Sequence, residues 1–596
     1  MFLVPVVVML QTVATAVAAP APLRAAGDDP PARVARLSFL AGRVSFQPSG
    51  DTTWSEATLN YTVTTGDRLY TDSGSRAELE IGGFAVRLAE STDLTITDLT
   101  DQFMQLGLTQ GTIRVSVSQL PLSDSIEVDT PNGALGLLEP GQYRVAILPS
   151  DSATVVTVDK GNAEVTGGDV REGIEAGHAV ELTGANPVLV SDVQSALPDA
   201  FDQWSAERDR RVTAAPAQYV SRDIPGYEDL DDAGRWRVDA DYGPVWYPER
   251  VAVDWVPYRD GRWVWVEPWG WTWVENEDWG FAPFHYGRWA FIGGAWGWVP
   301  GPVAVAPIYA PALVVFVGGA PPVSWRSGVE AWFPLGPREP YHPWYHNSDD
   351  YRIRVNESDL RGVGNVPALV HRPDVNTVAY ENRRSATTVV PATTFRNSEP
   401  VARHVVKVNP GWVSRAPITP HPAANPTPAA AAGGRPAVEP PRIARPVTVP
   451  GARGGQPGSE RPNPLPAGRG DASARRDVTG GAPRANRPPL VYRIAPSVSG
   501  PVNRPLQTPP PLVANRPPPP ENVPFPQRQQ AMQAHPGRPL EPQQVQNLRA
   551  GRPAGPMRDQ EVPPHPAPAP RAAPPARAAP QQAPRPAANP GRKPGR

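Results

Sequence analysis

The chain has 596 residues, of which 80 are proline and 52 glycine, so part of it is expected to stay unfolded. It contains no cysteine, which excludes disulfides, thiolate catalysis and cysteine-ligated zinc. The net charge of −2 hides an uneven distribution: residues 1–400 hold 30 basic and 51 acidic side chains, whereas residues 401–596 hold 27 and 8. An acidic body joined to a basic tail indicates an anionic partner for the tail, or contact between tail and body.

Residues 1–19 are typical of a secretory signal peptide. The apolar run Phe2–Leu10 is followed by Ala16-Val17-Ala18, an A-x-A cleavage pattern, although no Lys or Arg precedes the run. The run is too short for a membrane span, and no other stretch reaches the ~20 apolar residues that a span needs. We therefore expect an exported protein without a transmembrane span, located in the periplasm or on the extracellular surface.

Residues 34–184 read as successive β-strands. Apolar and polar residues alternate, as in Val86-Arg87-Leu88, and turn residues separate the alternating runs. A motif of the form Gly-x-apolar-x-apolar recurs at Gly42, Gly111 and Gly161. Successive coils or hairpins with one buried face would generate this motif, and about 150 residues suffice for a core.

The same region resembles the FecR domain of bacterial envelope proteins. The resemblance covers residues 36–184 and rests on GDRLYTDSGSRAELEIGGFAVRL, followed by QGTIRV, DTPNG, GQYRVAI, KGNAEV and AGHAVEL. It implies an all-β domain of solenoid or sandwich type. The best-known members relay a signal from an outer-membrane transporter to a sigma factor, but they carry a cytoplasmic segment and a membrane helix that we do not expect here. The relay role is therefore not carried over.

Residues 197–213 predict one helix that connects two domains. Asp199 can cap it, and Phe201 and Trp204 lie three positions apart on one face. We expect these two aromatics to pack inward and the charged residues to cover the other face.

Residues 219–345 are rich in tryptophan and repetitive. Twelve of the 18 tryptophans lie between Trp236 and Trp298, and the phrase Gly-Arg-Trp ends at Trp236, Trp263 and Trp289, 27 and 26 residues apart. An aromatic-Gly pair follows each phrase. Such a period indicates a copied supersecondary unit. With YVSRDIPGYEDLDDAGRW and DWVPYRDGRWVWVEPWGWTWV, the region resembles a Trp-rich domain of unknown function that commonly follows FecR domains.

The tryptophans allow two interpretations. An exposed aromatic platform could stack on sugar rings, whereas short hairpins could equally use large aromatics as their core. Strand alternation favours Trp263, Trp265 and Trp289 as the inner set. The candidates for ligand binding are Trp269, Trp271, Trp273, Tyr258 and Phe284. The arginines of the repeated phrase, Arg235, Arg262 and Arg288, either stack on indoles or meet anionic ligands, and we favour the stacking.

The remainder of the chain has a different composition. Residues 346–400 are transitional, and the alternation Tyr351–Val355 predicts a strand or two. Residues 401–596 contain 47 prolines and only three aromatics, which predicts a long, basic, Pro-rich disordered tail.

No catalytic constellation stands out. His342 and His346, with Asp349 and Asp350, have spacing that could serve a metal, but Pro343 favours a surface turn. No phosphate loop or nucleophile motif is present. We therefore expect no enzyme activity, no cofactor, no metal and no nucleic-acid partner.

The sequence thus predicts a mostly β protein with a FecR-like solenoid or sandwich, a connecting helix, a Trp-rich β-repeat module and a disordered tail. We expect a non-enzymatic binding or scaffold protein of the bacterial envelope that contacts polysaccharide, peptidoglycan or another anionic polymer. The alternative is a sensory or regulatory protein whose FecR-like domain docks on an envelope partner protein. A third hypothesis is an envelope hydrolase, but no catalytic arrangement of residues in the sequence supports it.

Overall fold

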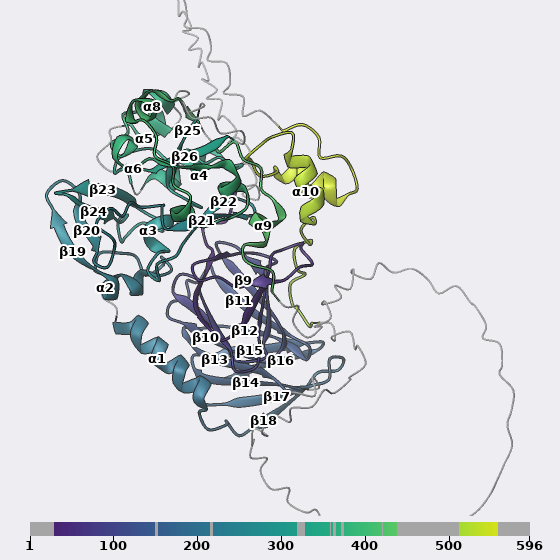
Figure 1. Ribbon diagram of the computed structural model, residues 1–596. Coiled ribbons are helices and arrows are strands. Elements are labelled where there is room, and N and C mark those ends of the chain that lie inside the picture. The colour runs from purple at the N-terminus through teal and green to yellow at the C-terminus, as the bar shows by residue number, and fades with distance from the viewer. Residues whose placement is uncertain are drawn as a thin grey trace, which may run out of the picture. The chain divides into compact units, whose positions relative to one another are not determined.

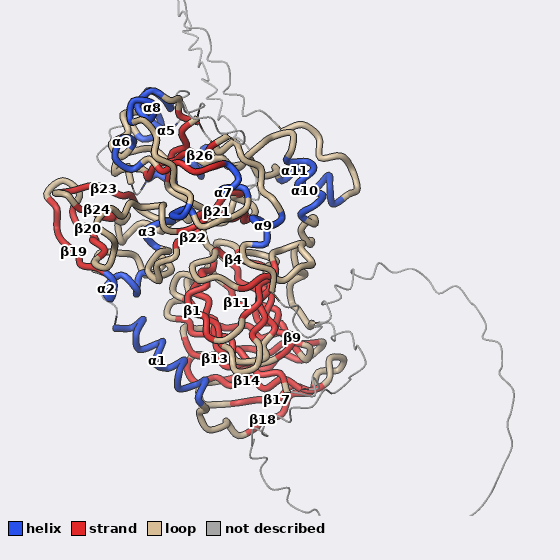
Figure 2. The backbone as a smooth tube through the Cα atoms, viewed as in Figure 1, coloured by secondary structure: helices blue, strands red, loops and turns tan. Residues whose placement is uncertain are grey.

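The computed structural model describes residues 29–148, 153–214, 218–318, 328–357, 359–360, 365–370, 375–419, 421–437 and 512–557. Within these ranges the chain is mostly β, as predicted, with strands in five sheets and mostly short helices (Figure 1, Figure 2). The predicted signal peptide and tail residues 438–511 and 558–596 lie outside the described residues. No described helix is long and apolar enough to cross a membrane.

The first domain is a two-layered β-sandwich rather than a solenoid, because every strand pair is antiparallel except β9–β11. Inward side chains such as Leu79 and Val86 from one sheet and Leu106 and Val128 from the other are completely buried in one core. Sheet A has the order β18 (Leu189–Val193), β17 (Ala179–Thr183), β14 (Ala153–Lys160), β13 (Gly141–Ile147), β10 (Thr112–Val117), β7 (Phe84–Leu88), β6 (Arg76–Glu80), β1 (Ala35–Ala41), β4 (Thr62–Val63). Sheet B has the order β16 (Val170–Ile174), β15 (Ala163–Gly167), β12 (Gly133–Leu137), β11 (Ser125–Thr130), β9 (Phe103–Gln110), β8 (Asp93–Leu99), β5 (Arg68–Thr71), β2 (Val44–Gln47), β3 (Ser55–Glu56).

The recurring Gly-x-apolar-x-apolar motif marks the corners at which the chain changes sheets. Gly42 lies between β1 and β2, Gly111 between β9 and β10, and Gly161 between β14 and β15, and each of these pairs joins sheet A with sheet B. All three glycines have a left-handed φ, between 75° and 85°. A Cβ at Gly161 would lie 2.3 Å from the Tyr143 hydroxyl, so the corner also needs the missing side chain. The two apolar positions that follow each glycine then point into the core.

Helix α1 (Ala200–Ala214) lies against the outer face of sheet A. Asp199 caps it as predicted, accepting hydrogen bonds from the amides of Phe201 and Asp202 at 2.8 and 2.9 Å. The predicted aromatic packing is present, with the Trp204 ring 5.1 Å from that of Phe39. The expectation that the charges face away is wrong for Asp202 and Asp209, which face the sheet.

The reason is a row of arginines across sheet A. Arg144, Arg114 and Arg87 are cross-strand neighbours on β13, β10 and β7. Asp202 binds both Arg114 and Arg144, at 2.6 and 2.5 Å, and Asp209 binds Arg87 at 2.7 Å. Three adjacent cations on one face would repel one another, and the carboxylates of α1 neutralise them.

The Trp-rich region consists of three β-hairpins, each opened by a Gly-Arg-Trp phrase. It begins with η1 (Tyr227–Asp229) and α2 (Leu230–Ala233). The hairpins are β19 (Gly234–Asp239) with β20 (Gly243–Pro248), β21 (Gly261–Val266) with β22 (Gly270–Glu275), and β23 (Arg288–Ile292) with β24 (Ala295–Val299), the last preceded by α3 (Ala282–His285). The first and third hairpins form sheet C, whereas the second forms sheet D alone, so the copies do not stack in sequence.

In each hairpin the tryptophan of the phrase pairs across the strands with a second tryptophan. The pairs are Trp236 with Trp246, Trp263 with Trp273, and Trp289 with Trp298. The second indole of each pair packs on the glycine of the phrase. A Cβ on that glycine would approach the indole ring to 2.5 Å at Gly234 and to 2.6 Å at Gly261 and Gly287. The repeated glycine is therefore required by an indole that covers its backbone.

The transitional segment is mainly helical. The stretch predicted as a strand forms α4 (Asp349–Glu357), because the buried Tyr351 and Val355 are spaced four apart, as on a helix face. Sheet E has the order β27 (Thr388–Pro391), β26 (Val329–Pro334), β25 (Val314–Val317), β28 (Ile418–Thr419). The other short helices of this segment are α5 (Val366–Val370), η2 (Val375–Thr377), α6 (Arg383–Ala386) and α7 (Ala392–Arg396). They are followed, beyond residue 400, by η3 (Val401–Arg403) and α8 (Pro410–Arg415).

Two stretches of the tail are folded, contrary to the prediction of disorder for all of residues 401–596. Residues 401–437 contribute η3, α8, β28 and α9 (Pro428–Ala432), and residues 512–555 contribute α10 (Phe525–Met532) and α11 (Pro542–Arg549). Proline stands in the first turn of α8, α9, α10 and α11, where it favours a helix instead of breaking it. The few apolar residues, such as Phe525 and Met532, are buried.

Candidate functional site

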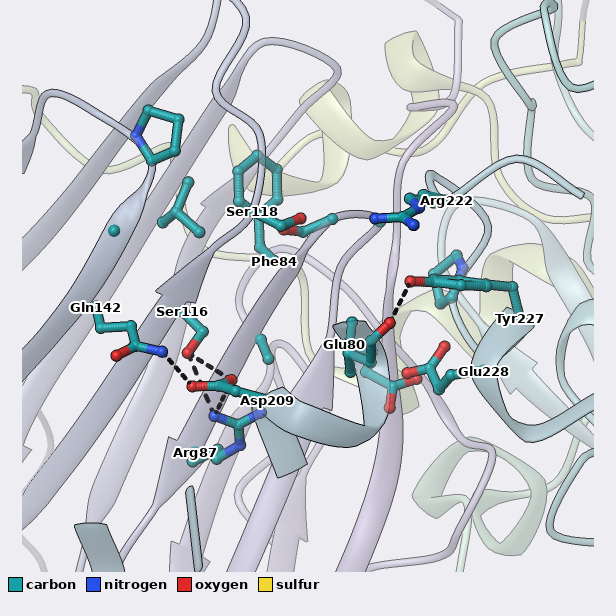
Figure 3. A pocket seen from close by; sticks show the side chains of 18 of the residues that line it. Glu80, Phe84, Arg87, Ser116, Ser118, Gln142, Asp209, Arg222, Tyr227 and Glu228 are labelled. Carbon is teal, nitrogen blue, oxygen red and sulfur yellow. Dashed lines mark hydrogen bonds and ion pairs between the residues drawn. The ribbon is translucent and has the colours of Figure 1, made fainter. Parts of the chain in front are cut away.

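A cavity of about 300 Å³ lies where sheet A, helix α1 and residues 222–228 meet (Figure 3). Strands β6, β7, β10 and β13 supply one part of its lining, and the loop before η1 supplies another. Phe84, Val117, Val212 and Ile224 give it an apolar surface. A cavity of this size accepts a small ligand, with polar groups to orient it.

One wall is organised around Asp209 of α1. Its carboxylate accepts hydrogen bonds from Arg87 at 2.7 Å, Ser116 at 2.8 Å and Gln142 at 2.7 Å (Figure 3). Burial alone would raise the pKa of Glu78 behind this wall, but the Arg87 and Arg208 guanidiniums lower it. Each charged side chain of this wall is therefore paired with a group of opposite charge within the fold.

The opposite wall contains a buried carboxylate pair, Glu80 and Glu228. Burial raises the pKa of Glu228 well above its ordinary value, and the neighbouring Glu80 carboxylate raises it further. Arg36 lies between the acidic groups, with Nη1 3.2 Å from Glu80 and 2.6 Å from Asp229. Gly226 makes room for this guanidinium, since a Cβ there would lie 2.4 Å from Nη1. The cluster joins the sandwich to the start of the Trp-rich region.

This pair is unsuited to hydrolysis. A glycosidase needs two carboxyl groups at least ~5 Å apart, with room for the scissile bond between them. Glu80 and Glu228 instead interact directly with each other, and Arg36 holds Glu80. The two carboxyl groups are instead part of a buried ionic network around Arg36.

The rim of the cavity carries two basic side chains, Lys160 and Arg222. Both are exposed, and neither forms an ion pair with any carboxylate in the described ranges. Ser118 and Tyr227 add hydroxyl groups to the lining, and the Tyr227 hydroxyl donates to the Val212 carbonyl at 3.3 Å. The free positive charges favour an anionic ligand.

The predicted aromatic platform is not exposed. Trp269, Trp271 and Trp273 are each 0% exposed, as are Tyr258 and Phe284. The expected exposure of the three tryptophans is therefore wrong, whereas Trp263, Trp265 and Trp289 are buried as predicted.

The physical reason is that later parts of the chain cover the second hairpin. The Trp271 Nε1 donates to the Ala424 carbonyl at 2.9 Å, and the Trp269 ring lies 5.0 Å from that of Tyr309. Pro539 lies over the turn, with Cδ 3.1 Å from the position of a Cβ on Gly270. Strand alternation shows which residues share a face but not what covers that face.

Tyr258 and Phe284 connect the hairpins internally. Their rings meet edge to face at 4.9 Å, and the Tyr258 hydroxyl donates to the Phe284 carbonyl at 2.7 Å. The same hydroxyl accepts from the Leu313 amide at 3.0 Å, so its hydrogen-bonding capacity is used within the fold.

The arginines of the repeated phrase bind acidic and carbonyl groups of the protein. Arg235 pairs with Glu249, and the buried Arg288 pairs with Asp359 at 2.8 Å. Arg262 donates to the Thr58 hydroxyl at 2.6 Å and the Gly433 carbonyl at 3.0 Å. Within the described ranges none of the three lies over an aromatic ring, so the expected indole stacking is wrong.

The sequence offered little signal for the cavity. Arg36, Glu80, Asp209 and Glu228 belong to four segments that only the fold brings together. The doublet Gly82-Gly83, at the turn between β6 and β7, lines the cavity and is a local sequence feature that could have pointed to it. Among the described residues no group of three or more metal-ligating side chains is placed to hold a metal ion.

Residues 227–339 match DUF6600, a family of unknown function. This match agrees with the resemblance of the Trp-rich region to a domain of unknown function. A search of curated proteins finds no match.

Among solved structures, two crystal structures of a proposed anti-sigma factor from Parabacteroides distasonis ATCC 8503 are similar to part of the chain. They are 15% and 16% identical, each with a TM-score of 0.19 and covering 21% of this chain. The match spans 60% of that protein's length. A similarity this low carries no conclusion about function, and the FecR resemblance stays a prediction.

Proposed function

We propose that this protein is a non-enzymatic binding protein of the bacterial cell envelope, with its ligand site in the cavity beside Asp209 and Glu228. The ligand class that suits the site is a small anionic fragment of an envelope polymer, such as a carboxylate-bearing fragment of peptidoglycan. The observation that carries the proposal is the pairing of an apolar lining with two free cations, Lys160 and Arg222, at the rim. Export is supported by the signal-like residues 1–19.

The lining favours an anionic sugar derivative over a purely apolar ligand. Phe84 and Ile224 offer apolar contact, Ser118 offers a hydroxyl, and the basic rim offers charge. The acidic groups of the cavity do not oppose an anion, because Arg36 and Arg87 neutralise Glu80 and Asp209.

Calorimetric titration of the full chain with soluble peptidoglycan fragments tests this proposal. We expect Lys160→Ala and Arg222→Ala each to weaken binding about tenfold, which corresponds to ~1.4 kcal/mol for a lost charged hydrogen bond. Arg403→Ala is the control, since Arg403 is exposed and does not line the cavity. Neutral chitooligosaccharides should bind more weakly than the charged fragments. Equal binding by wild type and Arg222→Ala, or no binding of any fragment, would contradict the proposal.

A sensory role is the second candidate, because two different parts of the chain line the cavity. Strands of the sandwich and residues 222–228, which precede the Trp-rich hairpins, both contribute to the cavity. A ligand that contacts both biases their arrangement. Hydrogen exchange measured with and without ligand should then show protection at Gly82–Ala85 and at residues 222–228 together. Protection at only one of the two would contradict a coupled response.

A further inference from the structure

Residues Leu512–Arg516 of the chain lie against the outer face of sheet B. Gly107, Asp129, Ala134 and Thr166 are cross-strand neighbours on β9, β11, β12 and β15. They alternate with core residues such as Leu106 and Val128, so the row lies on the side away from the core. Two of its four positions have a minimal side chain, which leaves a channel across the strands.

The channel recognises the main chain of its occupant. The Val513 amide donates to the Thr130 carbonyl at 2.9 Å, and the Asn515 amide donates to Glu127 at 3.0 Å. Gln105 Nε2 donates to the Arg516 carbonyl at 2.9 Å. All three bonds are made by main-chain groups of the segment, so they do not depend on its side chains.

Three further contacts select the side chains. Leu512 fills the space above Gly107, with Cδ1 2.9 Å from where a Cβ would be. The Thr166 hydroxyl donates to Asn515 Oδ1 at 2.8 Å. The Arg516 guanidinium lies 4.3 Å from the centre of the Phe103 ring, a cation–π contact.

The polar residues under the peptide are unusually buried for the outer face of a sheet. Gln105 is 0% and Asp129 2% exposed, and Gln105 Nε2 donates to Asp129 at 2.8 Å. Burial raises the pKa of Asp129 to about 9, together with the hydrogen bond that its protonated carboxyl donates to Glu127 and the repulsion from the Glu127 carboxylate. Asp129 Oδ1 and Gln105 Oε1 are buried without a hydrogen-bond partner among the described groups. The segment itself contributes to this burial, since Gln105 donates to the Arg516 carbonyl and the Asn515 amide donates to Glu127.

We propose that this row of sheet B is a peptide-binding groove for an extended, proline-flanked Leu-Val-Ala-Asn-Arg segment, and that Leu512–Arg516 is a tethered ligand that exchanges with the same segment of a second copy. Prolines flank the segment in the sequence on both sides, at 509–511 and 517–520. Proline lacks the amide hydrogen that an interior strand residue donates. The 74 residues between Ala437 and Leu512 span up to ~240 Å when extended, at ~3.3 Å per residue, so they can reach a neighbouring molecule. Exchange of an identical element between copies is a low-cost route to assembly.

The absence of cysteine allows a direct test by disulfide trapping in the full chain. Thr166→Cys and Asn515→Cys replace side chains that touch at 2.8 Å. When the two single variants are mixed and oxidised, we expect a covalent heterodimer whose yield rises with concentration. Synthetic peptide of residues 509–520 should suppress that heterodimer at least tenfold, because it competes for the groove. A tethered segment competes at an effective concentration of about 1 mM, so the peptide is needed at several times that level.

Two controls make the result decisive. Ser191→Cys, at an exposed position of sheet A outside the cavity, replaces Thr166→Cys to measure disulfides formed by random collision. Gly107→Val fills the channel at a position of ordinary φ, and circular dichroism of this variant checks that the sandwich stays folded. We expect Gly107→Val to reduce heterodimer yield to the level of the Ser191→Cys control. Yields with Thr166→Cys that equal those with Ser191→Cys, or that the peptide leaves unchanged, would overturn the proposal. These outcomes are independent of whether the cavity on sheet A binds a ligand.

Discussion

Each Gly-Arg-Trp glycine lies under an indole, and this contact makes a residue-scale prediction. Gly261→Ala should lower the free energy of unfolding by ~1–3 kcal/mol, because the new methyl would overlap the Trp273 ring and the Val274 carbonyl. Urea denaturation of the full chain measures the change. Gly173→Ala is the matched control, since nothing lies within 4 Å of a Cβ at Gly173. Equal stabilities of the two variants would show that the hairpin yields to the methyl group.

The tryptophans proposed as a ligand platform should behave like a tryptophan of the inner set. Trp269→Ala, Trp271→Ala and Trp273→Ala should each cost ~3–5 kcal/mol, as should Trp263→Ala, because all four side chains are completely buried. Thermal denaturation measures the loss. Should Trp271→Ala melt like wild type, the cover supplied by Ala424 and its neighbours would not exist in solution.

Glu330 makes the unfolding free energy depend on pH. Burial raises the pKa of Glu330 to about 7, and hydrogen bonds from the Ala423 and Ala424 amides oppose this only in part. The unfolded chain therefore releases this proton near pH 4.3, whereas the folded chain keeps it until about pH 7. Stability is lost as the pH rises between these values, on the order of 2–3 kcal/mol. Glu330→Gln should lack this contribution, so denaturation at pH 5 and pH 8 should differ less for the variant than for wild type. An unchanged difference would mean that Glu330 titrates normally.

At the scale of elements, the sequence predicted correctly those features that depend on residues close together in the chain. The Asp199 cap, the strands of the sandwich and the inner tryptophans follow from capping and periodicity. The stretch Tyr351–Val355 was assigned to the wrong element, because five residues fit the period of a strand and of a helix equally well. The cover over Trp271 and the cavity walls were beyond prediction, since both depend on residues more than 100 positions apart.

The ion pairs between α1 and sheet A can be measured as a coupling energy. A double-mutant cycle with Asp202→Ala and Arg144→Ala should give about 1 kcal/mol, because both side chains are largely buried and lie 2.5 Å apart. The exposed pair Arg235 and Glu249 should give close to zero in the same measurement. A negligible coupling at Asp202 would mean that the aromatics alone hold the helix on the sheet.

At the scale of the whole molecule, the charge asymmetry of the sequence corresponds in part to contact between tail and body. Arg528 of α10 pairs with Glu267 at 2.7 Å, and both side chains are largely buried. Composition averaged over 196 residues concealed this, because a few anchoring residues among many prolines hardly change the mean. Disorder was therefore predicted for stretches that fold against the body.

Removal of the folded tail stretch should loosen the second hairpin. Deletion of residues 512–596 takes away Arg528 and Pro539, which lie on Glu267 and Gly270. We expect faster hydrogen exchange at residues 265–271 and a lower melting temperature. Deletion of residues 558–596 alone is the control and should change neither. Identical exchange in both deletions would show that the hairpin is stable without its cover.

The paired indoles also give the protein a built-in optical reporter. The rings of Trp263 and Trp273 lie 5.5 Å apart at 72°, and those of Trp265 and Trp271 lie 5.4 Å apart at 86°. Indoles this close couple, so their excited states split and give a circular-dichroism couplet on the long-wavelength side of the amide band. The couplet arises in the hairpins, while the amide band is dominated by the larger sandwich. A single unlabelled sample heated once will therefore show whether the two parts of the chain unfold together or one after the other.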